Sequence, residues 1–209
     1  MYNKVFKRLF DIIFSGIAII ILLPFFIIFT PIVAIFMKGN PFFVQERPGK
    51  NCKIFKIIKY RTMTNKKDKE GNPLPDIKRL TKFGYFMRKY SIDELPELFN
   101  VFKGDMSIVG PRPLAVKYLE YYTEEENKRH FIRPGLTGLA QINGRNNLNW
   151  EDRFKYDLEY VNNISFLLDV KIIIKTLLKV ITKSNVSIRG TTEIIDFDEY
   201  RKKQREGNL

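Results

Sequence analysis

The pattern of hydrophobic and polar positions begins with a long apolar run near the N-terminus. Residues 12–36 form 25 consecutive positions without a charged side chain. A straight helix of that length spans roughly 37 Å, against about 30 Å for the hydrocarbon core of a bilayer. The run is too long for the core of a signal peptide, and no small-residue cleavage site follows it. It therefore predicts a membrane segment that is retained.

The hydrophobic pattern alone does not decide whether this segment crosses the bilayer or re-enters on the same side. Pro24 stands at its middle and Pro31 follows, and a proline inside a helix removes a backbone hydrogen bond and bends the helix. A bent single span is consistent with this, because membrane helices tolerate proline. A re-entrant segment that turns at Pro24 is equally consistent, since both flanks carry the lysines and arginines that favour the cytoplasmic side.

The next part of the chain alternates β-prone and helical patterns. Residues 42–63 hold two β-prone runs around the turn-forming sequence RPGKN, which predicts a hairpin. Residues 64–77 are polar and predict a loop. Residues 79–90 are basic and aromatic, which predicts an amphipathic helix at a membrane surface. Residues 91–104 predict a helix of about three turns that ends at its glycine.

The second half contains two segments rich in glycine, proline or asparagine. These segments, 104–115 and 132–147, predict irregular loops, and residues 116–131 between them predict a helix. Another helix is predicted over 150–163. Residues 166–183 predict a helix whose lysines recur every four residues. This last helix is either a core helix with one solvated face or a helix half sunk in a membrane interface.

Composition narrows the range of partners. The 209 residues include 36 Lys and Arg against 23 Asp and Glu, a formal net charge of +13. This excess indicates an anionic partner: nucleic acid, anionic lipid or a phosphorylated substrate. Cys52 is the only cysteine, which excludes an internal disulfide. His130 is the only histidine and is expected to be solvated, so a zinc site or a Ser-His-Asp triad is disfavoured.

The segment SIDELPELFN carries the strongest candidate chemistry. Asp93 and Glu94 stand side by side, with Glu97 close behind. Ser91 followed by Glu94 matches a capping box, a structural explanation for the acids. Pro96 instead favours a helix that begins near Asp93, because a missing N–H is tolerated in the first turn. The Asp93 carboxylate is then expected at the mouth of a helix, where a phosphate is also attracted.

Basic residues near these acids point to phosphate. Arg112 and Arg145 stand in the two predicted loops, and Lys59 ends the second β-prone run. A guanidinium group can bind two phosphate oxygens at once. Mg²⁺ is bound by one or two carboxylates together with substrate phosphates. Neighbouring helix residues point about 100° apart, so Asp93 and Glu94 do not fit two-carboxylate glycoside hydrolysis. They suit an attack by one carboxylate on phosphorus with help from the other.

A set of motifs spread over nearly the whole chain carries a family resemblance. They are FVQERPG, KIFKIIKYRTM, SIDELPELFNVFKGDMSIVGPRPL, RPGLTGLAQINGR and ISFLLDVKI. With them the chain resembles the bacterial sugar transferases, the small monotopic phosphoglycosyl transferases, and most of all the compact enzymes that start protein N-glycan assembly in Campylobacter-type bacteria. The resemblance implies transfer of a phosphosugar from a UDP-sugar to undecaprenyl phosphate, with release of UMP. This is the first membrane step of glycoconjugate assembly, at the cytoplasmic face of the bacterial inner membrane.

The resemblance also implies roles for individual residues. Asp93 is expected to be the nucleophile of a ping-pong reaction through a covalent phosphosugar intermediate, with Mg²⁺ beside it. Glu94 is expected to support it by handling a proton or by positioning. The residues expected to bind phosphate or to lie near the nucleotide and sugar are Lys59, Arg88, Arg112, Gln141, Asn143 and Arg145.

Together these features predict a mainly helical α+β fold. Its expected parts are a re-entrant membrane helix broken at Pro24, a small β-hairpin, and amphipathic interfacial helices around a compact catalytic core. We expect the membrane helix hairpin at 1–38, the catalytic domain at 39–183 and a polar, less ordered tail at 184–209. Family members often have serine before the proline, where this chain has Leu23. The chain lacks the N-terminal multi-span region of larger relatives, which predicts a minimal catalytic unit.

The expected partners are a UDP-sugar, undecaprenyl phosphate and anionic membrane lipids, and a homodimer is left open. By family analogy the sugar is an N-acetylated amino or diamino 6-deoxy sugar. Two other functions stay open on the residues. One is a Mg²⁺-dependent membrane phosphatase or pyrophosphatase. The other is a membrane-tethered nucleic-acid binder, although the chain has no recognised nucleic-acid motif and no nucleic acid is expected.

Overall fold

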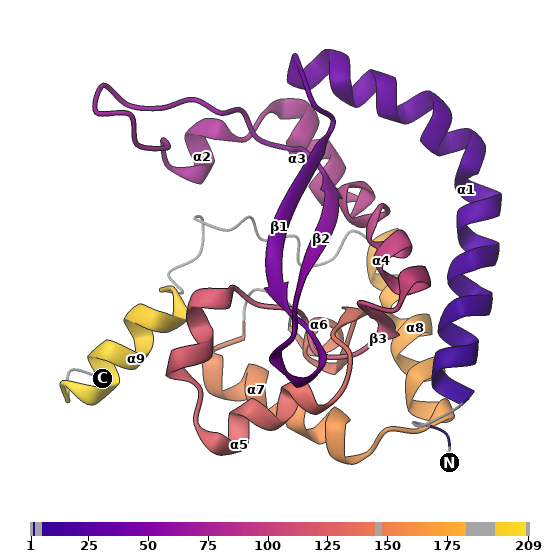
Figure 1. Cartoon of the computed structure of the whole chain (residues 1–209), viewed down its shortest axis with the longest axis vertical. Coiled ribbons are helices and arrows are strands. Elements are labelled where there is room, and N and C mark those ends of the chain that lie inside the picture. The colour runs from indigo at the N-terminus through magenta and orange to yellow at the C-terminus, as the bar shows by residue number, and fades with distance from the viewer. Residues whose placement is uncertain (1, 3–5, 145–147, 183–194, 208–209) are drawn as a thin grey trace.

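Helices dominate the structure, a computed structural model that describes residues 2, 6–144, 148–182 and 195–207 (Figure 1). They accompany two small sheets, one of them an antiparallel hairpin, so the predicted mainly helical fold with a hairpin is confirmed. The α-helices are α1 Lys7–Met37, α2 Asp76–Arg79, α3 Lys82–Lys89, α4 Glu97–Lys103, α5 Glu124–Asn127, α6 Leu139–Asn143, α7 Trp150–Asn162, α8 Phe166–Ile181 and α9 Phe197–Arg205. The strands are β1 Phe42–Pro48, β2 Ile54–Tyr60, β3 Ser107–Val109 and β4 Gly135–Thr137. The 3₁₀ turns are η2 Lys50–Cys52, η3 Ile92–Glu94, η4 Val116–Tyr121 and η5 Lys128–Phe131.

The apolar N-terminal run forms α1, which is long and apolar enough to cross a membrane. Only 11% of its most apolar 18-residue window is buried within the protein, whereas the core helix of a soluble protein would be mostly buried. The helix continues through Pro24 and Pro31 without separating into two helices. Figure 1 shows it bent along its length, which is the usual effect of proline inside a helix.

Polar anchors attach the first part of α1 to the rest of the protein. Lys7 Nζ lies 2.7 Å from Asp169 Oδ2 of α8, and both side chains are buried. Asp11 Oδ1 accepts hydrogen bonds from Ser107 Oγ at 3.0 Å and from the backbone N–H of Ile108 at 2.9 Å. The end of α1 packs differently: its apolar side chains cover Tyr60 of β2 and the neighbouring helix α3. Thus α1 contacts α8 and β3 near its beginning and β2 and α3 near its end.

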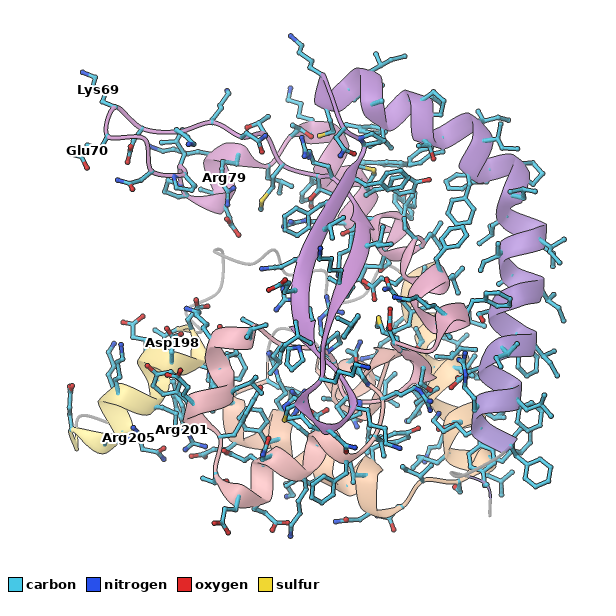
Figure 2. All side chains as sticks on the ribbon, viewed as in Figure 1. Lys69, Glu70, Arg79, Asp198, Arg201 and Arg205 are labelled. Carbon is cyan, nitrogen blue, oxygen red and sulfur yellow. The ribbon has the colours of Figure 1, made fainter. Side chains whose placement is uncertain are left out.

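The predicted hairpin is confirmed by the pairing of β1 with β2. The strands run antiparallel, from Phe42 opposite Tyr60 to Pro48 opposite Ile54. The long polar loop that follows β2 was also predicted, and Figure 2 shows Lys69 and Glu70 at its tip, pointing away from the rest of the chain. The hairpin places the end of β2 beside η3 and α4, and Tyr60 of β2 belongs to the same hydrophobic cluster as Met87 of α3.

The two segments predicted as irregular loops each contain regular structure, which corrects that prediction. β3 and β4 pair in parallel, with Ser107 opposite Gly135 and Val109 opposite Thr137. The glycines that indicated loops permit a close approach of two backbones here. A Cβ built on Gly135 would lie 2.1 Å from the Gly110 backbone nitrogen. Residues 139–143, in the second of these segments, form α6.

The helices of the second half follow the predictions in part. α7 and α8 form where they were expected. The predicted helix over 116–131 is instead a series of short elements, η4, α5 and η5. α8 buries Ile172 completely but leaves Leu167, Ile174 and Leu178 more than half exposed. Such exposure fits the interfacial interpretation of α8 better than the core one.

Part of the tail expected to be less ordered is a docked helix. α9 buries Phe197 against Tyr118, Trp150 and Phe154. Arg201 pairs with Glu126 on α5, and Figure 2 shows Asp198, Arg201 and Arg205 along this helix. Residues 183–194 lie outside the described residues. The aromatic ring of Phe197 explains the docking, because burying it removes a large apolar area from water.

His130 is buried, so the expectation of a solvated histidine is wrong. Its ring lies 5.4 Å from that of Tyr122. Burial, together with the nearby Arg129, lowers the pKa of His130 to about 3. The imidazole is therefore neutral at physiological pH and serves the packing of this region.

Candidate active site

A cavity of about 740 Å³ lies where β2, α3, η3, α6 and α8 meet. Its lining includes six of the residues predicted for the site: Lys59, Arg88, Asp93, Glu94, Arg112 and Gln141. Asn143 does not line it, because its side chain donates to the Leu139 carbonyl within α6. Arg145 lies outside the described residues, and Pro24 lies in α1, away from the cavity.

The acidic pair is presented by a tight turn rather than by the start of an α-helix. Ser91 adopts the left-handed conformation (φ 55°) and makes no capping hydrogen bond, so the alternative explanation of the acids as a capping box is wrong. Asp93 and Glu94 lie in η3, and the α-helix proper begins at Glu97, after Pro96. The predicted helix start near Asp93 is therefore wrong by one turn. A non-glycine residue in the left-handed region is strained, and here it directs the chain from α3 into η3.

Glu94 is held by two basic residues. Its Oε1 lies 2.6 Å from Arg112 Nη2 and 2.9 Å from Lys59 Nζ. Burial opposes the charge, but these cations outweigh it and hold the pKa of Glu94 well below its usual range. Glu94 is thus an anion that accepts hydrogen bonds throughout the physiological range.

Asp93 has a different environment from its neighbour. The residue is only 9% exposed, and within the described part of the chain its side chain makes no ion pair or hydrogen bond. Burial, reinforced by the charge of Glu94, raises the pKa of Asp93 to about 6. Two adjacent carboxylates with pKa values moved apart are typical of a division of labour.

A third carboxylate completes the cluster. Lys59 Nζ lies 2.8 Å from Glu97 Oε1 as well as close to Glu94, and Glu97 is almost fully buried. Burial raises the pKa of Glu97 to about 7, although Lys59 acts in the opposite direction. Burial also disfavours the charge of Lys59, but the two glutamates outweigh it and raise its pKa. Lys59 is therefore a fixed cation between two carboxylates.

Asn100 attaches α4 to the strand that carries Lys59. Its side chain accepts from the Ile58 N–H at 3.0 Å and donates to the Lys56 carbonyl at 2.8 Å. These bonds satisfy the edge of β2 that β1 does not cover and fix the distance between Lys59 and α4. Asn100 was not predicted from the sequence, where its place between apolar neighbours is the only available signal.

Arg112 is positioned by a buried ion pair that was likewise not predicted from the sequence. Arg129 Nη2 donates to the Arg112 carbonyl at 2.7 Å and to Asp157 Oδ2 at 2.8 Å. The side chains of Arg129 and Asp157 are each 2% exposed. The pair joins η5 and α7 to the Pro-Arg-Pro loop, so the backbone of Arg112 is held while its guanidinium faces Glu94.

Arg88, another basic residue of the cavity lining, is fixed by the chain that leaves β2. Its Nε donates to Thr62 Oγ1 at 3.0 Å. α3 approaches this segment closely because Gly84 has no side chain: a Cβ there would lie 2.0 Å from the Thr62 carbonyl oxygen. Asp76 and Arg79, paired at 2.5 Å, line the cavity from α2.

The residues present fit a Mg²⁺ ion only together with a substrate. Among the described residues, no group of three His, Cys, Asp or Glu side chains lies close enough to hold a metal ion. Asp93, however, is a buried carboxylate that lines a cavity with basic residues and forms no ion pair within the described part of the chain. Mg²⁺ needs one or two carboxylates when substrate phosphates supply other ligands. Asp93 meets that requirement.

These features describe a membrane-associated protein that combines a charged cavity with a helix long and apolar enough to cross a membrane. Residues 2–183 match the bacterial sugar transferase family, so the chain belongs to that family.

Three relatives illustrate the range of the family. The chain is 50% identical to the uncharacterized sugar transferase EpsL of Bacillus subtilis, over 87% of this chain and 90% of that protein. It is 39% identical to the exopolysaccharide production protein ExoY of Sinorhizobium fredii, over 82% and 83% of the two chains. It is 43% identical to the UDP-glucose:undecaprenyl-phosphate glucose-1-phosphate transferase of Klebsiella pneumoniae, over 85% of this chain but only 40% of that protein.

Proposed function

We propose that this protein transfers a sugar 1-phosphate from a UDP-sugar to undecaprenyl phosphate. The observation that carries the proposal is Asp93: a buried carboxylate that forms no ion pair with the described residues, in a cavity lined by Lys59, Arg88 and Arg112. Family membership and the name of the Klebsiella relative support the same chemistry.

In the first half-reaction the Asp93 carboxylate attacks the phosphorus that bears the sugar. A bond forms between Asp93 Oδ and phosphorus, and the bond from phosphorus to the bridging oxygen of the diphosphate breaks. UMP leaves with that oxygen, and a phosphosugar stays bound to Asp93 as an acyl phosphate. Arg88 and Arg112 lie where they can bind phosphate oxygens, since each guanidinium has further N–H donors beyond the bonds described.

In the second half-reaction a phosphate oxygen of the lipid attacks the same phosphorus. The bond between Asp93 and phosphorus breaks and returns the carboxylate, and the product is a polyprenyl diphosphosugar. The sequence of events is ping-pong, because UMP departs before the lipid reacts.

Glu94 acts in this scheme by position rather than by proton transfer. Its low pKa leaves it without a proton to donate, and its contacts fix Arg112 and Lys59 at the cavity wall. Its charge also helps to raise the pKa of Asp93, which makes the ionised Asp93 a better nucleophile.

Mg²⁺ held by Asp93 and the diphosphate would neutralise charge on the phosphate oxygens. The lipid substrate requires a membrane, and α1 supplies the attachment. We infer that α1 enters and leaves on the cytoplasmic face, with the bend near Pro24 turning it back. The net charge of +13 supports binding to anionic lipids at that face.

The test is mass spectrometry of the detergent-purified protein incubated with a UDP-sugar and Mg²⁺ but without lipid. We expect UMP release and a phosphosugar adduct on the peptide that contains Asp93. Asp93→Asn and chelation of Mg²⁺ should each abolish both signals, and addition of undecaprenyl phosphate should remove the adduct. Absence of the adduct after a cold quench would contradict the covalent mechanism.

The same assay separates the other functions. Release of sugar 1-phosphate or inorganic phosphate without a lipid-linked product would indicate a phosphatase or pyrophosphatase. Salt-dependent DNA binding that Asp93→Asn leaves unchanged would indicate a nucleic-acid binder. A panel of UDP-sugars, with glucose and galactose beside N-acetylated amino and diamino 6-deoxy sugars, identifies the donor.

A further inference from the structure

The cavity has two chemically different sides. Asp93, Arg88 and Arg112 form a charged side, built from α3, η3 and the Pro-Arg-Pro loop. α8 forms the other side and contributes Ile173, Leu177 and Val180, with Thr176 and Lys179 among them. A ligand that is charged at one end and apolar at the other would match both sides.

The hydroxyl on the α8 side is already engaged. Thr176 Oγ1 lies 2.6 Å from Thr137 Oγ1 and donates to the Ile172 carbonyl at 2.8 Å. A hydroxyl bonded in this way offers little to a sugar or a base, which need free donors and acceptors. The three aliphatic side chains beside it suit hydrocarbon.

This apolar wall continues out of the cavity. Leu177 lines the cavity and is also 58% exposed, while its neighbours Ile174 (53%) and Leu178 (56%) are exposed without lining it. At its other end α8 reaches α1, because the rings of Phe10 and Phe166 lie 5.3 Å apart. The surface outside Leu177 therefore belongs to the same apolar side of the protein as α1.

α1 itself contributes nothing to the cavity among the described residues. α8 offers an apolar path from the cavity to the surface, because Leu177 both lines the cavity and is exposed. The geometry points to Leu177, with Ile173 and Val180, as the exit for the prenyl chain of the acceptor lipid. This inference rests on the proposed function and names the part of the site that binds the second substrate.

If the prenyl chain leaves over Leu177, the two half-reactions should depend differently on this residue. The first half-reaction uses the charged side only, because the UDP-sugar has no hydrocarbon chain. The second half-reaction brings the prenyl chain across Leu177. A change at Leu177 should therefore affect the lipid and not the UDP-sugar.

The experiment compares Leu177→Gln with Leu178→Gln in the full chain, reconstituted with undecaprenyl phosphate. The two leucines are adjacent and equally exposed, so both substitutions remove the same apolar area from the lipid-facing surface, but only Leu177 lines the cavity. For Leu177→Gln we expect the KM for undecaprenyl phosphate to rise about tenfold, with single-turnover UMP release unchanged. For Leu178→Gln we expect both quantities to stay at the wild-type values.

Three outcomes overturn the inference. An equal rise in KM for both variants would assign the effect to membrane contact in general. Slower UMP release in Leu177→Gln would place this wall on the donor side. An unchanged KM in Leu177→Gln and in Leu177→Ala would remove Leu177 from the lipid path. Failure of the proposed function gives a different result, the absence of UMP release from the wild type. That result would overturn the proposed function, and the inference about the lipid exit would fall with it.

Discussion

Arg112 Nη2 lies 2.6 Å from Glu94 Oε1, and this contact holds Arg112 in the wall of the cavity that Asp93 also lines. The Glu94→Gln substitution removes the charge that holds Arg112 and Lys59. Since a misplacement of about 1 Å can cost about 10²-fold in rate, we expect single-turnover UMP release to slow by at least that order. The pH profile distinguishes the two possible roles of Glu94. A positioning role keeps the shape of the profile and moves it to lower pH, because the pKa of Asp93 falls. Loss of one limb of the profile would indicate a proton carrier instead.

The pH dependence of the first half-reaction should report on Asp93. Burial and the charge of Glu94 raise the pKa of Asp93 to about 6, and only the ionised carboxylate attacks phosphorus. UMP release in a single turnover should therefore increase as the pH rises through about 6 and level off above it. Quenched-flow measurement with labelled UDP-sugar gives the rate. A rate that is constant from about pH 5 to about pH 8 would contradict the raised pKa.

Glu97 should make thermal stability depend on pH. Burial raises its pKa from 4.5 to about 7, so the folded protein keeps a proton that the unfolded chain has released. The resulting stability is present below the unfolded pKa and is lost as the pH rises through about 7. Glu97→Gln cannot ionise, so its Tm should fall less than that of the wild type between about pH 5 and about pH 8. Glu159→Gln, on the exposed surface of α7, is the control and should follow the wild type.

The sequence predicted those parts of the site that local patterns determine. The hairpin and the helices α7 and α8 follow from periodicity and turn residues, and the motifs identified Lys59, Arg88, Asp93 and Arg112. Local pattern does not record which distant backbones come into contact. The parallel pairing of β3 with β4 depends on the close approach of Gly110 and Gly135.

Buried polar residues were the least predictable part. Asn100, Arg129 and Asp157 hold the site through partners that lie 17 to 44 residues away along the chain. In the sequence they resemble ordinary polar positions of surface helices. The left-handed conformation of Ser91 is likewise imposed by the packing of α3 and η3 rather than by its residue type, since serine rarely adopts it.

The ion pair between Arg129 and Asp157 should be important for both folding and activity. Asp157→Asn leaves the Arg129 guanidinium buried without its anion, and breaking a buried pair in this way costs about 3–5 kcal/mol. We expect a loss of that size in denaturant unfolding, together with slower UMP release, because Arg129 also holds the Arg112 backbone. Glu199→Gln removes an exposed partner of Lys203 and should change stability by less than about 1 kcal/mol. Equal effects of the two substitutions would show that burial of the Arg129 pair is unimportant.

The bend of α1 should decide on which side of the membrane its N-terminus lies. A straight helix of its 31 residues would be about 46 Å long, more than enough to cross about 30 Å of hydrocarbon. With Pro24 in place, we expect an epitope tag ahead of Met1 and a cysteine at Asn40→Cys to be accessible from the cytoplasmic side alone. Inverted vesicles, an impermeant maleimide and a Cys52→Ser background provide the measurement.

Pro24→Ala should restore the backbone hydrogen bond, straighten the helix and move the tag to the other side. Ile20→Ala, on the exposed surface of the same helix, is the control and should leave the tag in place. If the tag and the cysteine at position 40 are accessible from opposite sides of the membrane while Pro24 is retained, α1 is a single span instead.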